Sequence, residues 1–226
     1  MAVKIIQAST LQDAVYEELV RRIMSGELAP GQKITAMTIA EKLGVSSQPV
    51  RGALRRMEAE KTISIHNKQI LITEITPAEL TEIFEALSLN LSYAVKRATV
   101  QRSEETVQTL EDALYHIKTA RDADNFFANS LKFFMTVYHE SKNPALMDVI
   151  NHLLGRIAFY RYMAFKSWYE EDRSPLEENC THMLNGIKKK SVKDTTKWFG
   201  RELKLIYKHL MKAVQEHEKN RRLNNS

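Results

Sequence analysis

The side chains of this sequence that are best suited to bind another molecule lie in one short segment. Small hydrogen-bonding groups come first and two arginines follow: Ser46, Ser47, Gln48, Arg51 and Arg55. On a helix that begins here, the first groups could reach the edges of nucleic-acid bases, while the guanidinium groups hold phosphates. Apolar residues recur between them at helical spacing and form an inward face: Val50, Ala53, Leu54 and Met57. The segment therefore predicts a recognition helix that binds DNA.

The residues on either side of this helix predict the remainder of a helix-turn-helix. Gly44 provides the left-handed conformation in which a preceding helix can end, and Pro49 is tolerated in a first helical turn. Ser46 has a side chain that can cap that turn. By itself, the segment would also suit an ordinary helical turn with a solvated basic face. Upstream, however, Ser9 and Gln12 have the spacing of a capping box at the start of a first helix.

A second short helix and a β-hairpin complete the pattern. Residues 35–43, TAMTIAEKL, predict the helix before the turn, and residues 62–73, TISIHNKQILIT, predict the hairpin because two β-branched runs flank polar residues. We expect His66 and Lys68, which lie in that polar stretch, to contact a groove or phosphates. Three short helices followed by a hairpin is the order of a winged helix-turn-helix.

Residues 9–75 resemble the N-terminal domain of the GntR family of bacterial transcription regulators. The resemblance is carried by three strings: VYEELVRRIMSGELAPGQKI, IAEKLGVS and PVR-ALRRMEAE. The helical remainder resembles the effector domain of the FadR subgroup, the FCD domain, mainly through its helix order and the NPAL segment at residues 143–146. The resemblance implies a homodimer that binds double-stranded operator DNA and senses a small-molecule effector.

The DNA-binding segment departs from the family at several positions. The usual Ser-Arg-Thr-Pro reads Ser-Ser-Gln-Pro at residues 46–49, and Met37 replaces the usual basic residue of the second helix. The hairpin also lacks the usual tip glycine, so its turn type stays open. Arg51 remains and can read guanine with two hydrogen bonds, while Gln48 can read adenine. We therefore expect an operator that differs from the one common in the subgroup.

The sequence predicts a mainly α protein with two domains. Thr76, Pro77 and Glu79 have the pattern of a helix start with a capping box, which places a winged helix-turn-helix at residues 1–75 and an FCD-like effector and dimerisation domain at residues 76–226. Capping side chains mark further helix starts at or near Ser103, Asp124, Asn143, Ser174 and Ser191. About six helices with short connections imply an antiparallel bundle.

The resemblance also implies a metal in this bundle, held by one Asp and three His. The corresponding positions here are Ser130, Phe134, Cys180 and Glu202. A phenyl ring cannot bind a metal, and a serine is a poor replacement for a carboxylate. Histidines occur nearby but lie off the expected register: His139, His182 and His209. We therefore expect neither a metal nor another cofactor.

A member without the metal resembles the regulators that respond to fatty-acyl or other apolar molecules. The aromatic residues around Phe133 and the run IAFYRYMAF at residues 157–165 offer apolar walls, and nearby arginines can face an anionic group. The candidate effector-binding residues are Phe134, Tyr138, Arg156, Tyr160, Arg161 and Cys180. Two alternatives stay open: an ordinary bundle core with surface arginines, and a DNA-binding dimer whose bundle senses no ligand.

Composition is consistent with a cytoplasmic regulator and excludes other classes. Cys180 is the single cysteine, so no intrachain disulfide can form, and its neighbour His182 lies two residues away, on a different helix face. The seven glycines form no phosphate-binding loop, and no catalytic pair of residues is evident, so we expect no enzyme activity. The net charge of +5 is modest, and no apolar run is long enough to span a membrane.

Overall fold

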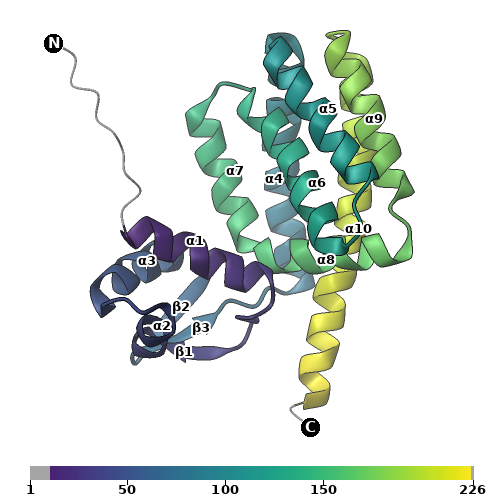
Figure 1. Ribbon diagram of the computed structural model, residues 1–226. Helices are drawn as coiled ribbons and strands as arrows, with labels where there is room; N and C mark the ends of the chain where they lie inside the picture. Colours follow the sequence, from purple (N-terminus) through teal and green to yellow (C-terminus); the bar gives the residue numbers. More distant parts are fainter. Residues whose placement is uncertain (1–10, 225–226) are drawn as a thin grey trace, which may run out of the picture. The chain divides into compact units, whose positions relative to one another are not determined.

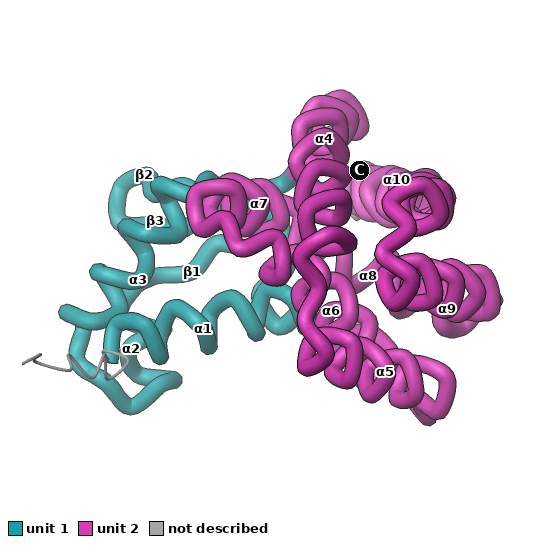
Figure 2. Tube along the Cα trace, turned by 90° about the horizontal axis from the view of Figure 1, so that it is seen from above, with its two compact units in different colours: residues 1–74 teal, residues 75–226 magenta. Residues whose placement is uncertain are grey.

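The computed structural model describes residues 11–224, so the predicted capping residue Ser9 lies outside the described residues (Figure 1). The chain divides into two compact units, and the division falls between Glu74 and Ile75 (Figure 2). We call them unit 1 and unit 2. Within the described residues, unit 1 contains three helices and a three-stranded sheet, and unit 2 contains seven helices.

Unit 1 has the element order of a winged helix-turn-helix. Its elements are α1 (Leu11–Met24), β1 (Lys33–Thr35), α2 (Ala36–Leu43), α3 (Ser47–Ala59), β2 (Ile63–His66) and β3 (Gln69–Ile72). The strands are antiparallel in the order β1-β3-β2, with Ile63 opposite Ile72 and Lys33 opposite Leu71. The predicted mainly α fold with an N-terminal winged helix-turn-helix is confirmed.

The inward face that the sequence predicted for α3 is buried. Val50 and Ala53 have no exposed surface, and α3 packs against α1. The two helices approach closely at Gly52, where an added Cβ would lie 2.1 Å from the side-chain oxygen of Gln12. Gly44 ends α2 with a φ of 64°, as predicted.

The wing turn needs no glycine. Asn67 and Lys68 form its two central residues, with φ values of 49° and 65°. Two successive residues in the left-handed region give a turn whose twist matches that of antiparallel strands. Asn adopts this region more readily than most residues, which explains how the hairpin closes without the family's tip glycine.

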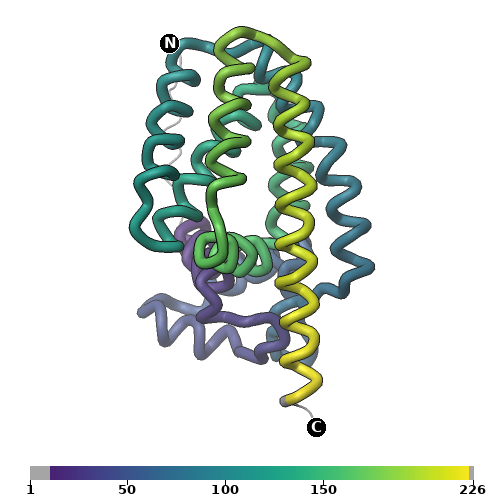
Figure 3. The backbone as a smooth tube through the Cα atoms, turned by 90° about the vertical axis from the view of Figure 1, so that its right-hand side faces the viewer, coloured from purple at the N-terminus to yellow at the C-terminus, as the bar shows by residue number. Residues whose placement is uncertain are grey.

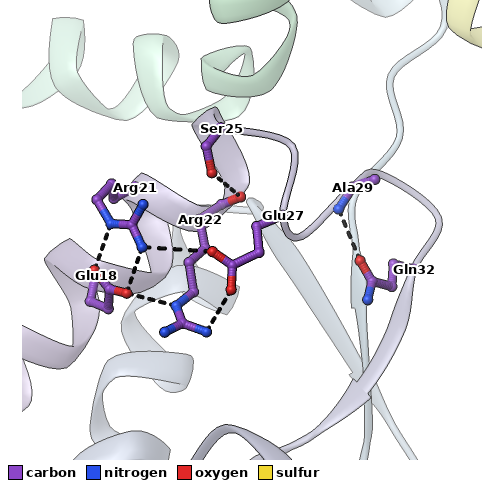
Figure 4. Close-up of polar contacts among 7 residues, drawn as sticks. All are labelled: Glu18, Arg21, Arg22, Ser25, Glu27, Ala29 and Gln32. Atoms are coloured by element: carbon purple, nitrogen blue, oxygen red, sulfur yellow. Dashed lines mark hydrogen bonds and ion pairs between the residues drawn. The ribbon is translucent and has the colours of Figure 1, made fainter. Parts of the chain in front are cut away.

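Charged side chains connect α1 to the turn before β1 (Figure 4). Glu18 accepts hydrogen bonds from Arg21 Nε and Arg22 Nε, each at 2.7 Å. Arg22 Nη1 also donates to Glu27 at 2.8 Å, beyond the end of the helix. These hydrogen bonds lower the pKa of Glu18 to about 2. The ionised carboxylate therefore holds two arginines beside the point where the chain turns back at Gly26, whose φ is 78°.

Unit 2 is formed by helices alone within the described residues. They are α4 (Pro77–Gln101), α5 (Glu104–Lys118), α6 (Ala123–His139), α7 (Pro144–Arg156), α8 (Ala158–Glu171), α9 (Ser174–Lys188) and α10 (Val192–Asn224). The predicted capping box at Thr76 and Glu79 is present at the start of α4. Ser103, Asp122 and Asn143 each cap a helix through the side chain.

The described residues of unit 2 form seven helices, one more than the sequence predicted. The segment that the sequence suggested as a single helix after Asn143 ends at Arg156, and α8 begins at Ala158. Ile157 between them has φ −109° and ψ 13°, and no side chain caps the start of α8. Because the break has neither a proline nor a capping residue, the usual helix-boundary signals could not reveal it.

The long helix α10 organises unit 2. It packs against α4, α8 and α9, and Figure 3 shows it running beside α9 and continuing past it toward the C-terminus. Large side chains from several helices fill the interior, among them Phe126, Phe133, Trp168 and Phe199. None of the helices within residues 11–224 combines the length and the apolar character that crossing a membrane would require.

Candidate nucleic-acid interface and bundle cavity

The start of α3 presents polar side chains to solvent. Ser46, Ser47 and Gln48 are exposed. Ser46 is the residue before the helix, but its hydroxyl makes no capping hydrogen bond, contrary to the prediction. A capping side chain binds the second or third amide of the helix, and the third residue here is Pro49, which has no N–H. The hydroxyl therefore keeps its hydrogen-bonding capacity for another molecule.

The arginines on α3 differ in their contacts with other residues of unit 1. Arg56 stacks on the ring of Tyr16 at 3.7 Å from its centroid and donates to Glu60 at 3.1 Å. Arg51 and Arg55 are exposed, and neither forms an ion pair with any residue in the described part of the chain. Their guanidinium groups are therefore free to bind an anion outside unit 1, whereas that of Arg56 supports the fold.

A surface concavity of about 580 Å³ lies between α3, the start of α2 and the wing. Its lining brings together three of the predicted residues, Arg51, Arg55 and Lys68, with exposed Met37 at the start of α2. His66 is exposed at the end of β2 but does not line the concavity, and the same is true of the polar residues at 46–48. Three cations around one concavity favour a polyanion such as a nucleic-acid backbone.

A second cavity lies inside the helical bundle. Its walls are apolar and come from α4, α6, α7, α8 and α10: Phe84, Leu87, Leu91, Phe127, Leu131, Phe134, Leu154, Ile157, Phe165, Leu203, Ile206 and Leu210. Two polar side chains complete the lining, Tyr138 and Arg161. The free space is about 30 Å³, enough for a water molecule but not for an effector. A ligand would therefore have to displace wall side chains.

Arg161 is an unpaired cation in these apolar surroundings. Burial lowers the pKa of its guanidinium, and the neighbouring Tyr138 partly opposes that shift. Within residues 11–224 the side chain forms no ion pair, and its backbone amide bonds to its own helix turn. Arg161 is half-buried, and a partly desolvated charge without a partner is costly, so an anion that entered the cavity would bind here favourably.

The predicted effector residues separate into two groups. Phe134, Tyr138 and Arg161 line the cavity together, and the Phe134 and Tyr138 rings stack with centroids 6.3 Å apart. Tyr160, in contrast, is buried and its hydroxyl accepts a hydrogen bond from the backbone N–H of Ile75 at 3.4 Å. The other two, Arg156 and Cys180, also lie outside the cavity lining.

Sequence reasoning missed most of the cavity walls. The contributions of α4 and α10 are leucines, an isoleucine and a phenylalanine at helical spacing, which resemble any core face. The one distinguishing signal is that Arg161 stands within a run of aromatic and apolar residues. That signal identified the arginine but not the helices opposite it.

The residues at the family's metal positions do not fit a metal. Phe134 is buried, stacks on Tyr138 and meets the Phe133 ring edge-on, and the Ser130 hydroxyl donates to the carbonyl of Phe126 at 2.7 Å. Burial raises the pKa of the Cys180 thiol well above its usual range, so the metal-binding thiolate is disfavoured. Burial also raises the pKa of Glu202 to about 8. No group of three or more His, Cys, Asp or Glu side chains in residues 11–224 is arranged to hold a metal ion.

Two of the three histidines near these positions stack on tryptophan rings, and the third is exposed. His182 stacks on Trp198 with centroids 3.9 Å apart, and His209 stacks on Trp168 at 4.6 Å. His139 is exposed at the end of α6. The three rings thus lie on different parts of the bundle and do not rebuild the family site.

Two family models match the chain. Residues 11–69 match the bacterial regulatory proteins of the gntR family, and residues 79–192 match the FCD domain. The first match covers the α3 surface and most of the wing. The second covers half of the chain and includes most helices that line the bundle cavity.

Named relatives and solved structures agree with these matches. The HTH-type transcriptional regulator McbR of Escherichia coli is 29% identical over 153 residues, which cover 66% of this chain and 68% of that protein. The gluconate operon transcriptional repressor of Bacillus subtilis is 28% identical over 150 residues, 65% of this chain and 61% of that protein. The structure of E. coli McbR superposes with a TM-score of 0.80 at 22% identity, covering 93% of this chain and all of that one.

Proposed function

Because the chain belongs to the gntR family of bacterial regulatory proteins and carries an FCD domain, it is a DNA-binding transcription regulator, and we propose how its two units divide that work. Unit 1 binds operator DNA through the start of α3 and the wing. Unit 2 forms a homodimer and senses an effector in the bundle cavity without the family metal. Like its relatives, which are transcription regulators, the chain has no catalytic role in this proposal.

The DNA-binding surface that we propose consists of the seven exposed polar residues predicted from the sequence: Ser46, Ser47, Gln48, Arg51, Arg55, His66 and Lys68. The observation that carries it is the concavity where Arg51, Arg55 and Lys68 meet without ion-pair partners in the described residues. Cations at the rim of a recognition helix hold phosphates, and the polar groups at its start reach base edges.

Substituting Arg51 tests this surface. The wild-type protein would first select a high-affinity duplex from a random-sequence library, and fluorescence anisotropy at fixed salt would then measure binding. We expect Arg51→Ala to weaken binding by about 1–3 kcal/mol. The matched control is Arg121→Ala, which removes an exposed arginine from unit 2. Equal affinity of wild type and Arg51→Ala would contradict the assignment of the reading face.

The effector that we propose is an apolar molecule with one anionic group. Support comes from the thirteen uncharged residues and the one unpaired cation, Arg161, that line the bundle cavity. A carboxylate would pair with the guanidinium, while the apolar part would replace contacts among the walls. The effector would change the affinity for the operator only if the dimer has two conformations that differ in their affinity for DNA. The effector must also bind one of these conformations more tightly than the other.

Three ligands that share one alkyl chain test the effector class. Decanoate, decanol and decylamine would be added at micromolar concentration, and tryptophan fluorescence would follow thermal unfolding, since both tryptophans, Trp168 and Trp198, lie in unit 2. We expect decanoate to raise the melting temperature most and decylamine least. Arg161→Met should remove the preference for decanoate over decanol. If none of the ligands shifts the wild type, a dimer that senses no ligand becomes the better account.

The dimer is proposed from the size of the DNA-binding unit. One winged helix-turn-helix reads few base pairs, so useful specificity requires two copies on a two-fold symmetric operator. Light scattering at micromolar concentration, with and without the selected duplex, tests this. A protein that stays monomeric in both conditions would contradict it.

A further inference from the structure

A groove on the surface of unit 2 lies between α8 and α10, where α10 continues past α8 (Figure 1). Its free volume is about 290 Å³, close to the lower limit of about 300 Å³ for small-molecule sites. It shares no lining residue with the bundle cavity. The two helices meet through aromatic rings on either side of the groove. The Phe159 and His217 centroids are 5.8 Å apart, and those of Trp168 and His209 are 4.6 Å apart.

The charged side chains of this α8–α10 groove are only partly paired. Lys212 donates to Glu171. Lys166, Glu170 and Glu216 also line the groove, and none of them forms an ion pair with another described residue. One cation and two carboxylates are therefore available to a ligand. They complement a molecule that carries one carboxylate and two cationic nitrogens.

A buried imidazole adds a polar group to the wall. His209 is only 8% exposed, and its Nδ1 has no hydrogen-bond partner within residues 11–224. Burial lowers the pKa of the ring, so the ring is neutral at neutral pH. A neutral imidazole donates through one nitrogen and accepts through the other. Because buried polar atoms without a partner are uncommon, a ligand group that bonds to Nδ1 would remove an unfavourable feature of the fold.

The remaining wall suits a short hydrocarbon chain. Phe159, Met163 and Ala213 contribute apolar surface to the groove. Methylene groups would pack against these side chains, and an ammonium group would be attracted to the face of the Phe159 ring. Glu216 directly precedes His217, whereas Glu170 follows Trp168, so the two carboxylates flank different ring contacts. A ligand whose two cationic groups are separated by a chain would fit this arrangement.

We propose that the α8–α10 groove binds a basic amino acid. The ligand's carboxylate pairs with Lys166, and its two cationic groups pair with Glu170 and Glu216. An anionic molecule would instead face two unpaired carboxylates, and the described residues contain no group of side chains arranged to hold a metal ion. The inference goes beyond the function proposed above, because it requires neither operator DNA nor an effector in the bundle cavity.

Three molecules with similar carbon chains test the charge pattern. Lysine carries both ammonium groups and the carboxylate. Norleucine lacks the side-chain ammonium, and cadaverine lacks the carboxylate. Isothermal titration calorimetry on the full chain, with each molecule at millimolar concentration, would measure binding. We expect norleucine and cadaverine each to bind about fivefold more weakly than lysine, because each loses one ion pair at a partly solvated site. Equal affinity for lysine and either analogue would overturn the proposal.

Substitutions in the groove test each charge separately. Lys166→Met retains most of the side-chain length and should remove the preference for lysine over cadaverine. Glu170→Gln combined with Glu216→Gln should remove the preference for lysine over norleucine. The matched controls are Lys132→Met on α6 and Glu105→Gln on α5, which change exposed residues outside the groove. Both controls should bind lysine as the wild type does.

The stacking of Trp168 on His209 provides a readout of where lysine binds. The chain has two tryptophans, so in Trp198→Phe the emission comes from Trp168 alone. Lysine should change this emission, because a ligand at His209 alters the ring that stacks on the indole. Circular dichroism would check that every variant is folded.

The outcomes keep this groove separate from the bundle cavity. If lysine produces no binding heat, or if the groove variants bind it as tightly as the wild type, the proposal is wrong. The groove variants should still respond to decanoate as the wild type does, since they leave the cavity lining intact. A loss of both responses would mean that the substitutions disturb the bundle, and the assignment of the groove would be overturned.

Discussion

Glu18 in unit 1 and Glu202 in unit 2 are the same residue type under opposite conditions. Glu18 lies near the surface and accepts hydrogen bonds from two arginines, which lower its pKa to about 2. Glu202 is fully buried, and burial raises its pKa to about 8 although Asn179 donates to it at 2.8 Å. The carboxylate of Glu18 is paired and hydrated, whereas that of Glu202 is enclosed without a counter-ion in the described residues.

The arginines show the same contrast. Arg51 in unit 1 is exposed, so its charge costs little to maintain and is available to a large polyanion. Arg161 in unit 2 is half-buried against apolar walls, which disfavours its charge but strengthens any contact with a small anion. The difference teaches that exposure, more than residue type, determines whether a cation is suited to DNA or to an effector.

The largest effect that we expect concerns the pH dependence of unit 2. The folded-state pKa of Glu202 lies above its unfolded value of 4.5, so the folded state binds the proton more tightly. Its contribution to stability is therefore complete below about pH 4.5 and is lost as the pH rises to about 8, a change of about 3–5 kcal/mol. Urea unfolding followed by tryptophan fluorescence would measure this.

Glu202→Gln supplies the comparison for that measurement. The amide cannot ionise, so the variant should lose less stability than the wild type between these pH values. Asp112→Asn, an exposed substitution in the same unit, should leave the wild-type pH dependence unchanged. Parallel pH curves for wild type and Glu202→Gln would show that the carboxyl does not carry a raised pKa.

The second prediction replaces the half-buried cation Arg161. Arg161→Met retains most of the side-chain volume and removes an unpaired charge, so we expect it to stabilise unit 2 by about 1–4 kcal/mol. Arg51→Met in unit 1 should change stability by less than about 0.5 kcal/mol. Chemical denaturation of unit 2, together with amide hydrogen exchange of α3, would measure both. Destabilisation by Arg161→Met would mean that the guanidinium has an ordered partner such as bound water.

The third prediction concerns the cations of unit 1. Lys68→Ala should weaken binding to all duplexes by similar amounts and reduce the slope of log affinity against log salt concentration by about 1, because one phosphate contact is lost. Arg51→Ala should in addition reduce the discrimination among sequences. Anisotropy titrations at several salt concentrations, on the selected duplex and a scrambled one, distinguish the two. A uniform loss for both variants would make Arg51 a phosphate contact.

The smallest effect is expected at Glu18. Its lowered pKa contributes stability above the unfolded value near 4.5, and this contribution is lost as the pH falls to about 2. Since solvent screens the group, Glu18→Gln should cost less than about 1 kcal/mol at neutral pH. Hydrogen exchange of the α1 amides would measure this loss of stability. A larger loss would show that the arginine contacts, rather than apolar packing, hold α1 to the turn.

Local signals predicted unit 1 well. Three features carried the prediction: the apolar face of α3, Gly44 at the end of α2, and the two β-branched runs of the wing. Each is formed by residues that lie close together in the sequence, so a short segment is enough to reveal it. Ser46 is the exception: Pro49 removes the third amide of the helix, and the Ser46 hydroxyl makes no capping hydrogen bond.

The cavity in unit 2 could not be predicted in the same way. Its lining comes from five helices that are far apart in the sequence, and apolar residues of a cavity wall are the same as those of a filled core. The end of α7 at Arg156 could not be predicted either, because neither a proline nor a capping side chain marks it. Arg156 and Tyr160 lie close to Arg161 along the chain, but neither lines the cavity.

The small size of the bundle cavity has a consequence for how quickly the regulator responds. With about 30 Å³ of free space, the cavity would admit the proposed effector only once its walls move apart. The observed association rate would then stop rising at high effector concentration, at a limit set by the opening of the protein. The apparent affinity would also fall short of the intrinsic one by the fraction of open molecules. Substitutions that enlarge the cavity, such as Leu131→Ala, would therefore speed the response as well as strengthen it.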